Sequence, residues 1–315
     1  MRKLLLFTAV LMVALGGSAM AMTLDEATAL FVGSDIVIPY SDEGQAQLEE
    51  AIAAFREALG VTDALDEANE DDLMAFEVDA SLMDIIPMLE QCYYTLADAF
   101  LGEDEATVKP FYLRGKHWGL KVLRMDPEFA ATEAADGFVA AVNGSDNLEG
   151  LYWTSSNWLR AGQFDVLAAV FAGMPEKTEA ITLRCMELDE TYTHYGAYRA
   201  LGAFWSGLPS LPAGKFRKNW NASLSHFCKI VDEPALCGAC DDCTDFGAID
   251  PSVHEYLENR MFFVEFYLME RGLWADAKRV VDSVVADGIG DKYLLYNAIS
   301  LEKAALFLET IEENL

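Results

Sequence analysis

Apolar residues recur three and four positions apart along most of the chain, and no stretch alternates apolar and polar residues over the length of a strand. This spacing is typical of amphipathic α-helices. Residues 41–59 show the pattern clearly, with Ile52, Phe55 and Leu59 on one stripe and Ser41 in the position of an N-cap. The pattern therefore predicts an all-α protein.

Prolines and turn residues divide the pattern into separate helices. A helix begins at Asp79 or Ser81, and Pro87 marks a kink in it or its true start. Pro110 is expected to begin the next helix, and the Asp-Pro pair at 126–127 to end it. Further helices are predicted at about 128–142, 147–161, 163–173, 175–189, 191–206, 214–231, 251–271, 273–286 and 291–312.

Short turns between amphipathic helices favour antiparallel neighbours, and a series of such pairs favours a helical solenoid. Residues 51–55 (AIAAF) fit the A-x3-F spacing of tetratricopeptide helices. Residues 162–165 and 272–277 resemble the turns that open such repeats. We therefore expect a tetratricopeptide-like solenoid or bundle of antiparallel helix pairs, forming one domain over residues 22–315. A non-repetitive helical bundle is the alternative, because the copies are irregularly spaced.

The N-terminus has the order of a secretory signal peptide. Arg2 and Lys3 precede an apolar run at 4–15, and the small-residue site Ala-Met-Ala follows at 19–21. We expect residues 1–21 to be cleaved and the protein to be exported to the periplasm. An uncleaved membrane anchor is the alternative, although the apolar run is short for a span.

The formal net charge of −30 argues against nucleic-acid binding, which depends on neutralising phosphates with Lys and Arg. The chain contains no G-x-S-x-G, H-E-x-x-H or P-loop motif, and no pair of its many carboxylates stands out for acid–base catalysis. We therefore expect a protein that is not an enzyme and has no cofactor.

Four cysteines cluster in a predicted loop at about 228–250: Cys228, Cys237, Cys240 and Cys243. In an oxidising compartment two local disulfides are the first interpretation. A tetrathiolate zinc site is the second, because four thiolates complete a tetrahedral shell. An iron–sulfur cluster or redox catalysis through the C-x-x-C pair are further alternatives.

Aromatic residues gather with a few polar ones in the segments 151–158 and 192–205. Packing between helices accounts for most such rings, and a histidine on such a face is usually a core residue. The functional interpretation is an apolar pocket with polar groups that orient a ligand. The candidate ligand-binding residues are Tyr152, Trp153, Asn157, Trp158, His194, Tyr195, Arg199 and Trp205.

Several motifs, taken together, resemble one known family. Residues 112–120 (YLRGKHWGL) resemble its R-G-x-x-W/Y-G/A-L helix, and residues 151–158 (LYWTSSNW) its L-Y-W-T/S-x-x-x-W helix. Residues 188–209 follow its L-D-E-x-Y…G-A…L-G…P pattern, and residues 294–304 its closing L-x-N-x-x-A…K/R-A helix. The family is the TatT-like T component associated with TRAP transporters, and the resemblance spans about residues 90–312.

The resemblance implies a non-enzymatic, helical-repeat protein of the periplasm. Family members pair with a periplasmic substrate-binding protein. Some form trimers, which implies that this protein is a homo-oligomer. Their hydrophobic cavities imply a ligand such as a sterol-like or other lipid. Two features depart from the family: residues 18–21 (SAMA) precede Met22, so there is no lipobox cysteine, and the cysteine-containing loop is an addition.

Overall fold

A computed structural model describes residues 21–210, 214–240, 243 and 250–315. The described chain is helical except for one short hairpin, which confirms the predicted all-α class. The predicted signal peptide lies, apart from its last residue, outside the described residues. None of the described helices combines the length and the apolar character needed to cross a membrane.

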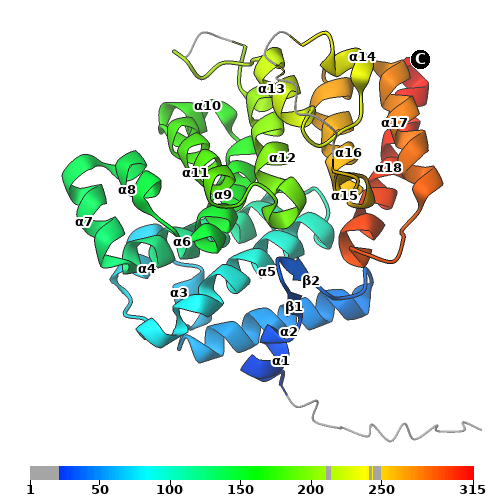
Figure 1. Ribbon diagram of the computed structural model, residues 1–315. Helices are drawn as coiled ribbons and strands as arrows, with labels where there is room; N and C mark the ends of the chain where they lie inside the picture. The colour runs from blue at the N-terminus through cyan, green and yellow to red at the C-terminus, as the bar shows by residue number, and fades with distance from the viewer. Residues whose placement is uncertain (1–20, 211–213, 241–242, 244–249) are drawn as a thin grey trace, which may run out of the picture.

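The N-terminal half runs from a small hairpin to a layer of long helices (Figure 1). The two strands pair antiparallel, with Phe31 opposite Ile36. The elements are α1 (Leu24–Thr28), β1 (Phe31–Val32), β2 (Asp35–Ile36), α2 (Asp42–Ala58), α3 (Asp63–Asp66), α4 (Glu70–Ala75), the 3₁₀ turn η1 (Ala80–Ile85), α5 (Ile86–Ala99), α6 (Glu105–Met125), α7 (Pro127–Asp136), α8 (Phe138–Gly144) and α9 (Leu148–Gln163).

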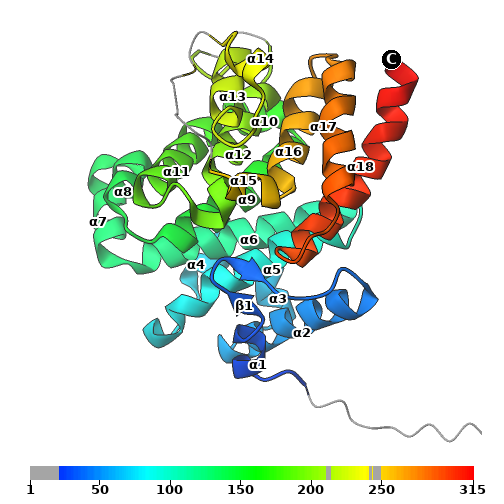
Figure 2. The same ribbon diagram turned by 45° about the vertical axis from the view of Figure 1, so that its right-hand side comes forward.

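The C-terminal half continues the helical chain, and α17 and α18 lie at the opposite end of the molecule from α7 and α8 in both views (Figure 1, Figure 2). Its elements are α10 (Val166–Phe171), α11 (Met174–Leu188), α12 (Tyr192–Gly207), α13 (Trp220–Phe227), α14 (Pro234–Cys237), α15 (Ser252–Glu255), α16 (Glu258–Phe263), the π-helical turn η2 (Val264–Met269), α17 (Trp274–Asp287) and α18 (Leu294–Asn314).

Several predicted boundaries are confirmed and others are wrong. Ser41 caps α2 as expected, and α5 begins beside Pro87 after the turn η1. Pro110 lies inside α6 rather than at its start, because Asp104 accepts a hydrogen bond from Thr107 N and begins the helix one turn earlier. The predicted helix at 128–142 is divided at Gly137, whose φ of +93° ends α7.

Neighbouring helices pack in sequence order, α5 against α6, α9 against α11 and α12 against α13, as expected for helical repeats. Helix α6 also packs closely on α9. Glycines permit this approach: a Cβ on Gly119 would collide with Thr154 Oγ1, and one on Gly115 with the side chain of Asn157. The close packing of α6 on α9 therefore depends on the lack of a side chain at these two glycines.

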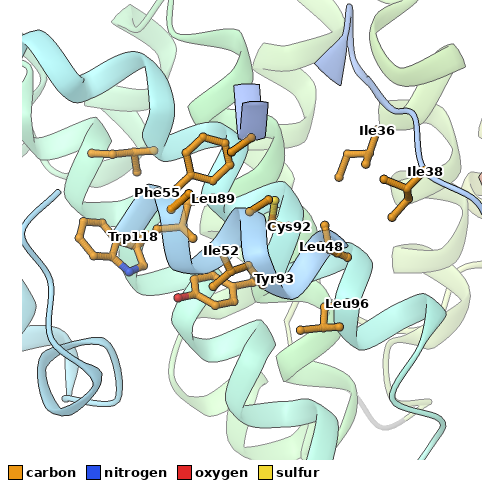
Figure 3. Close-up of a cluster of buried hydrophobic side chains, with 14 of the residues drawn as sticks. Ile36, Ile38, Leu48, Ile52, Phe55, Leu89, Cys92, Tyr93, Leu96 and Trp118 are labelled. Carbon is orange, nitrogen blue, oxygen red and sulfur yellow. The ribbon is translucent and has the colours of Figure 1, made fainter. Parts of the chain in front are cut away.

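A large hydrophobic cluster joins this layer to α2 (Figure 3). Trp118 of α6 and Tyr93 of α5 are fully buried in it, beside Phe55 of α2. Cys92 belongs to the same cluster as a buried free thiol, and Cys185 is a second buried free thiol in another cluster. Burial of this kind stabilises the fold by roughly 25 cal/mol per Å² of apolar surface.

Glu90 lies in the middle of the α5–α6–α9 layer and is fully buried. Its Oε1 has no hydrogen-bond partner among the described residues, and its Oε2 is 3.4 Å from Thr154 Oγ1. The Thr154 hydroxyl donates at 2.5 Å to Gly150 O, which leaves it little to offer Glu90. Burial raises the pKa of Glu90 well above the ordinary 4.5, so the carboxyl is held in its neutral form.

Replacement of Glu90 by glutamine should therefore change how stability depends on pH. The unfolded carboxyl loses its proton above about pH 4.5 while the folded one keeps it, so the free energy of unfolding falls as pH rises, by up to about 1.4 kcal/mol per pH unit. We expect Glu90→Gln to exceed the parent in stability at pH 8 and to approach it at pH 5, measured by chemical denaturation. Exposed Glu312→Gln is the control, and parallel pH profiles for parent and Glu90→Gln would contradict the neutral carboxyl.

The cysteine loop contains two disulfide pairs, Cys228 with Cys237 and Cys240 with Cys243. Residues 241–242 and 244–249 of the loop lie outside the described residues. In the described part of the chain, no three His, Cys, Asp or Glu side chains gather in a group that could hold a metal ion. The geometry thus agrees with the first interpretation of the cluster, local disulfides.

The two disulfides should contribute unequally to stability. A cross-link restricts the unfolded chain more when it closes a longer loop. The pair Cys228–Cys237 spans nine residues and Cys240–Cys243 only three. We expect the double serine variant of the first pair to lose about 2.5 kcal/mol of unfolding free energy and that of the second about 1.5 kcal/mol. Destabilisation of the parent by a zinc chelator, instead of by a reductant, would contradict the pairing.

Candidate functional site

A cavity of about 950 Å³, part of it open to solvent, lies between α9, α12, α16 and α18 and is bordered by the β1–β2 hairpin. Aromatic side chains from five helices and from the α15–α16 junction form much of its wall. They are Tyr94, Tyr152, Trp153, Phe204, Tyr256, Phe262 and Tyr296.

Helix α9 provides one wall because its lining residues share a face. Tyr152, Ser156, Leu159 and Gln163 follow one another three or four positions apart, and Arg160 follows Ser156 by four; all five border the cavity. The opposite side of α9 packs against the glycines of α6, which fixes where this wall stands.

Helix α12 provides the facing wall, and its small residues leave room for the cavity. Its lining positions include Gly196, Ala200, Ala203 and Gly207, which recur at helical spacing. Small side chains along one face of a helix create room where larger ones would fill it.

Arg160 is a mostly buried cation of the α9 wall, with 13% of its side chain exposed. Its Nη2 donates to Asp98 Oδ1 at 2.5 Å, and its Nε donates to Tyr94 OH at 3.3 Å. Lys303 Nζ of α18 lies 3.4 Å from the other oxygen of Asp98. The pair with Asp98 ties α9 to α5 and neutralises the guanidinium.

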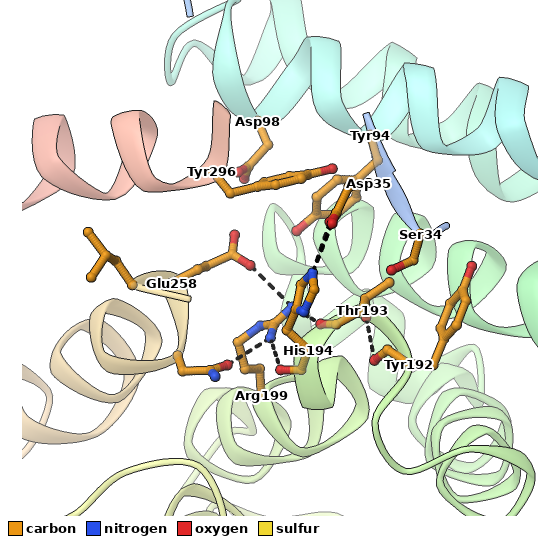
Figure 4. Close-up of polar contacts among 12 residues, drawn as sticks. Ser34, Asp35, Tyr94, Asp98, Tyr192, Thr193, His194, Arg199, Glu258 and Tyr296 are labelled. Carbon is orange, nitrogen blue, oxygen red and sulfur yellow. Dashed lines mark hydrogen bonds and ion pairs between the residues drawn. The ribbon is translucent and has the colours of Figure 1, made fainter. Parts of the chain in front are cut away.

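Arg199 occupies the α12 wall and holds an unusual backbone segment (Figure 4). Residues Thr193, His194 and Tyr195 have φ values of 46°, 56° and 65°, in the left-handed region. That region costs a non-glycine residue roughly 1–2 kcal/mol. Arg199 donates to the Thr193 and His194 carbonyls at 2.9 and 2.7 Å.

Two further acceptors complete the surroundings of Arg199. Its Nη1 donates to Asn259 Oδ1 at 2.7 Å, and its Nη2 lies 3.2 Å from Glu258 Oε2. The side chain of Arg199 is 4% exposed. Its charge is therefore paired with Glu258, and its donors are largely used within the protein.

The hairpin reaches the cavity through Ser34 and Asp35. His194 Nε2 lies 2.9 and 3.2 Å from the two carboxylate oxygens of Asp35, and its ring is close to those of Tyr256 and Tyr293. Figure 4 shows Asp35 directly above His194, beside Arg199. The contact joins the N-terminal hairpin to α12 at the border of the cavity.

Three of the predicted ligand-binding residues, Tyr152, Trp153 and Arg199, line this cavity. His194 lies beside it, since its neighbour Thr193 lines the wall. Whether these residues bind a ligand stays a prediction.

The other four predicted residues have partners away from the lining. Asn157 donates to the carbonyls of Glu90 and Trp153, which makes it part of the α5–α9 contact. The ring of Trp158 packs edge-on against Phe138. Tyr195 OH donates to Asp250, and Trp205 stacks on Phe216.

The sequence reasoning missed several residues of the wall. Arg160 follows Tyr152 and Trp153 by eight and seven positions, so the helical period alone could have placed it on the same face. No such signal exists for Asp35, Tyr256 and Glu258, which come from distant segments.

Helix α10 lies at the rim of the cavity and presents apolar residues to solvent. Val166 lines the cavity, while Leu167 and Phe171 are 52% and 88% exposed. None of the six residues of α10 is buried. An exposed apolar surface of this kind is typical of a contact site.

Comparison with known protein families gives a match over the middle of the chain. Residues 90–230 match the model of the family described as TRAP transporter T-component. No curated protein matches the chain. The matched segment runs from α5 to just beyond α13 and includes Tyr152, Trp153, Arg160 and Arg199. The match confirms, over residues 90–230, the resemblance to the TRAP transporter T-component family found in the sequence motifs.

Proposed function

We propose that this protein is a periplasmic, non-enzymatic component that binds a hydrophobic, lipid-like ligand and docks the substrate-binding protein of a TRAP transport system. The family match associates the chain with such a transport system. Export rests on the signal-like N-terminus, and the two disulfide pairs suit an oxidising compartment.

The observation that carries the ligand proposal is the cavity whose wall is formed largely by aromatic side chains and by small residues of α12. Burial of roughly 300 Å² of apolar ligand surface would supply about 7 kcal/mol before the costs of association. That scale suits a ligand that is handed over rather than stored. Sterol-like lipids and other hydrophobic molecules fit this description.

A scaffold that binds proteins without a ligand is the alternative function. It would need no internal space, and the small residues along α12 favour the ligand proposal over it. The two functions differ in what a filled cavity would do, which the following variant tests.

Substitution of Ala200 by tryptophan should fill the cavity from the α12 wall. We expect the affinity for Nile red, a neutral apolar dye, to fall at least about tenfold because the indole occupies the ligand's space. Fluorescence titration measures the affinity, and circular dichroism checks that the helices persist. Ala134→Trp on the exposed side of α7 is the matched control. Equal dye binding by Ala200→Trp and the parent would count against this cavity as the ligand site.

The partner proposal places the substrate-binding protein on α10, since the apolar surface of α10 continues into the cavity through Val166. We expect Phe171→Ser to weaken binding of the substrate-binding protein of the same transport system about tenfold or more, because an exposed aromatic ring is a typical anchor of an interface. Surface plasmon resonance measures the loss. Leu306→Ser, at 55% exposed on α18, is the control. A loss shared by both variants, or by neither, would place the docking surface elsewhere.

A further inference from the structure

The charged groups on the cavity wall cancel one another. The wall contains two acidic residues, Asp35 and Glu258, and two basic ones, Arg160 and Arg199. Behind Arg160, Asp98 and Lys303 cancel in turn. Glu265 is also close to this group, and burial raises its pKa, which favours its neutral form. The formal charges of the wall and of the groups behind it therefore sum to zero.

The wall does have hydrogen-bonding capacity that the protein leaves unused. Among the described residues, the carboxylate of Glu258 has the guanidinium of Arg199, at 3.2 Å, as its single polar partner. The hydroxyl of Tyr256 likewise has no hydrogen-bond partner in the described part of the chain, although its ring packs beneath Arg199. Both residues line the cavity and lie two positions apart, at the junction of α15 and α16.

An alcohol complements these two groups. A hydroxyl has one proton to donate and two lone pairs to accept. It can donate to the carboxylate of Glu258 and accept from the phenol of Tyr256. Arg199 cannot take this role as readily, since it already has the Thr193, His194 and Asn259 oxygens as acceptors.

A charged head group fits less well. A carboxylate would enter a space whose two guanidinium groups already face carboxylates, and an ammonium would compete with Arg199 for Glu258. An uncompensated charge in a mostly apolar cavity is costly. From these observations we propose that Glu258 and Tyr256 bind the hydroxyl group of an uncharged, otherwise apolar ligand. The proposal rests on the ligand-binding function proposed above and specifies its ligand class.

Three ligands with straight alkyl chains of similar length test the proposal by displacement of Nile red from the full-length protein at pH 7.5. They are 1-dodecanol, dodecyl methyl ether, which lacks the hydroxyl proton, and dodecanoate, which is charged. For the parent protein we expect the alcohol to bind about threefold to tenfold more tightly than the ether. Equal binding of alcohol and ether would overturn the proposal.

Two variants test separately the hydrogen bond to the ligand hydroxyl and the neutralisation of Arg199 by Glu258. Tyr256→Phe should weaken dodecanol binding about threefold to tenfold and leave dodecanoate unchanged. Glu258→Gln keeps an acceptor but leaves Arg199 without its carboxylate, so dodecanoate should bind about tenfold more tightly while dodecanol changes less. Tyr293→Phe, beside His194 but outside the lining, is the matched control.

The outcomes distinguish the two levels of the proposal. If neither the dye nor any ligand binds the parent, the ligand-binding function fails. If all three ligands bind alike, or if Glu258→Gln leaves the affinity for dodecanoate unchanged, the cavity remains a ligand site and the alcohol assignment is wrong. Thermal unfolding of each variant checks folding, and Tyr256→Phe, the milder change, keeps the test decisive if Glu258→Gln does not fold.

Discussion

The close contact of α5, α6 and α9 sets the position of everything around the cavity. Two glycines of α6 let α9 approach until Asn157 donates to the backbone of Glu90 at 3.1 Å. This leaves a carboxyl group, that of Glu90, in the apolar layer, where it is stable only as the neutral acid. Because one side of α9 is fixed in this way, its opposite face must present Tyr152 and Arg160 to the cavity.

The left-handed segment at 193–195 lies on the α12 side of the cavity, facing α9, and is held by Arg199. Three consecutive non-glycine residues in this region are unfavourable in isolation, and two carbonyls of the segment accept hydrogen bonds from Arg199. The guanidinium that does this also lies on the cavity wall. Its charge is paired and most of its N–H groups are hydrogen-bonded within the protein, so Glu258 and Tyr256 remain as the groups that can recognise a ligand.

The sequence predicted some of the wall residues on α9 and α12 and missed Arg160 and the residues that come from distant segments. The segment 151–158 indicated Tyr152 and Trp153 correctly as neighbours, but Trp158 faces Phe138 because it lies on another face of α9. The strands of the hairpin have two residues each, too few to show an alternating pattern. Thr193 and its neighbours lack the glycine that usually signals a left-handed turn, and the capping effect of Asp104 outweighed the proline signal at Pro110.

Two ion pairs join helices that border the cavity. Arg160 with Asp98 ties α9 to α5, and Arg199 with Glu258 ties α12 to α16. Breaking either pair would leave a charge in a largely apolar environment, which costs more than the contact itself contributes. Each ion pair brings one positive and one negative charge to the surroundings of the cavity. The pairing that ties these helices together also balances the charges around the cavity, and balanced charges favour a ligand whose polar end forms hydrogen bonds without carrying charge.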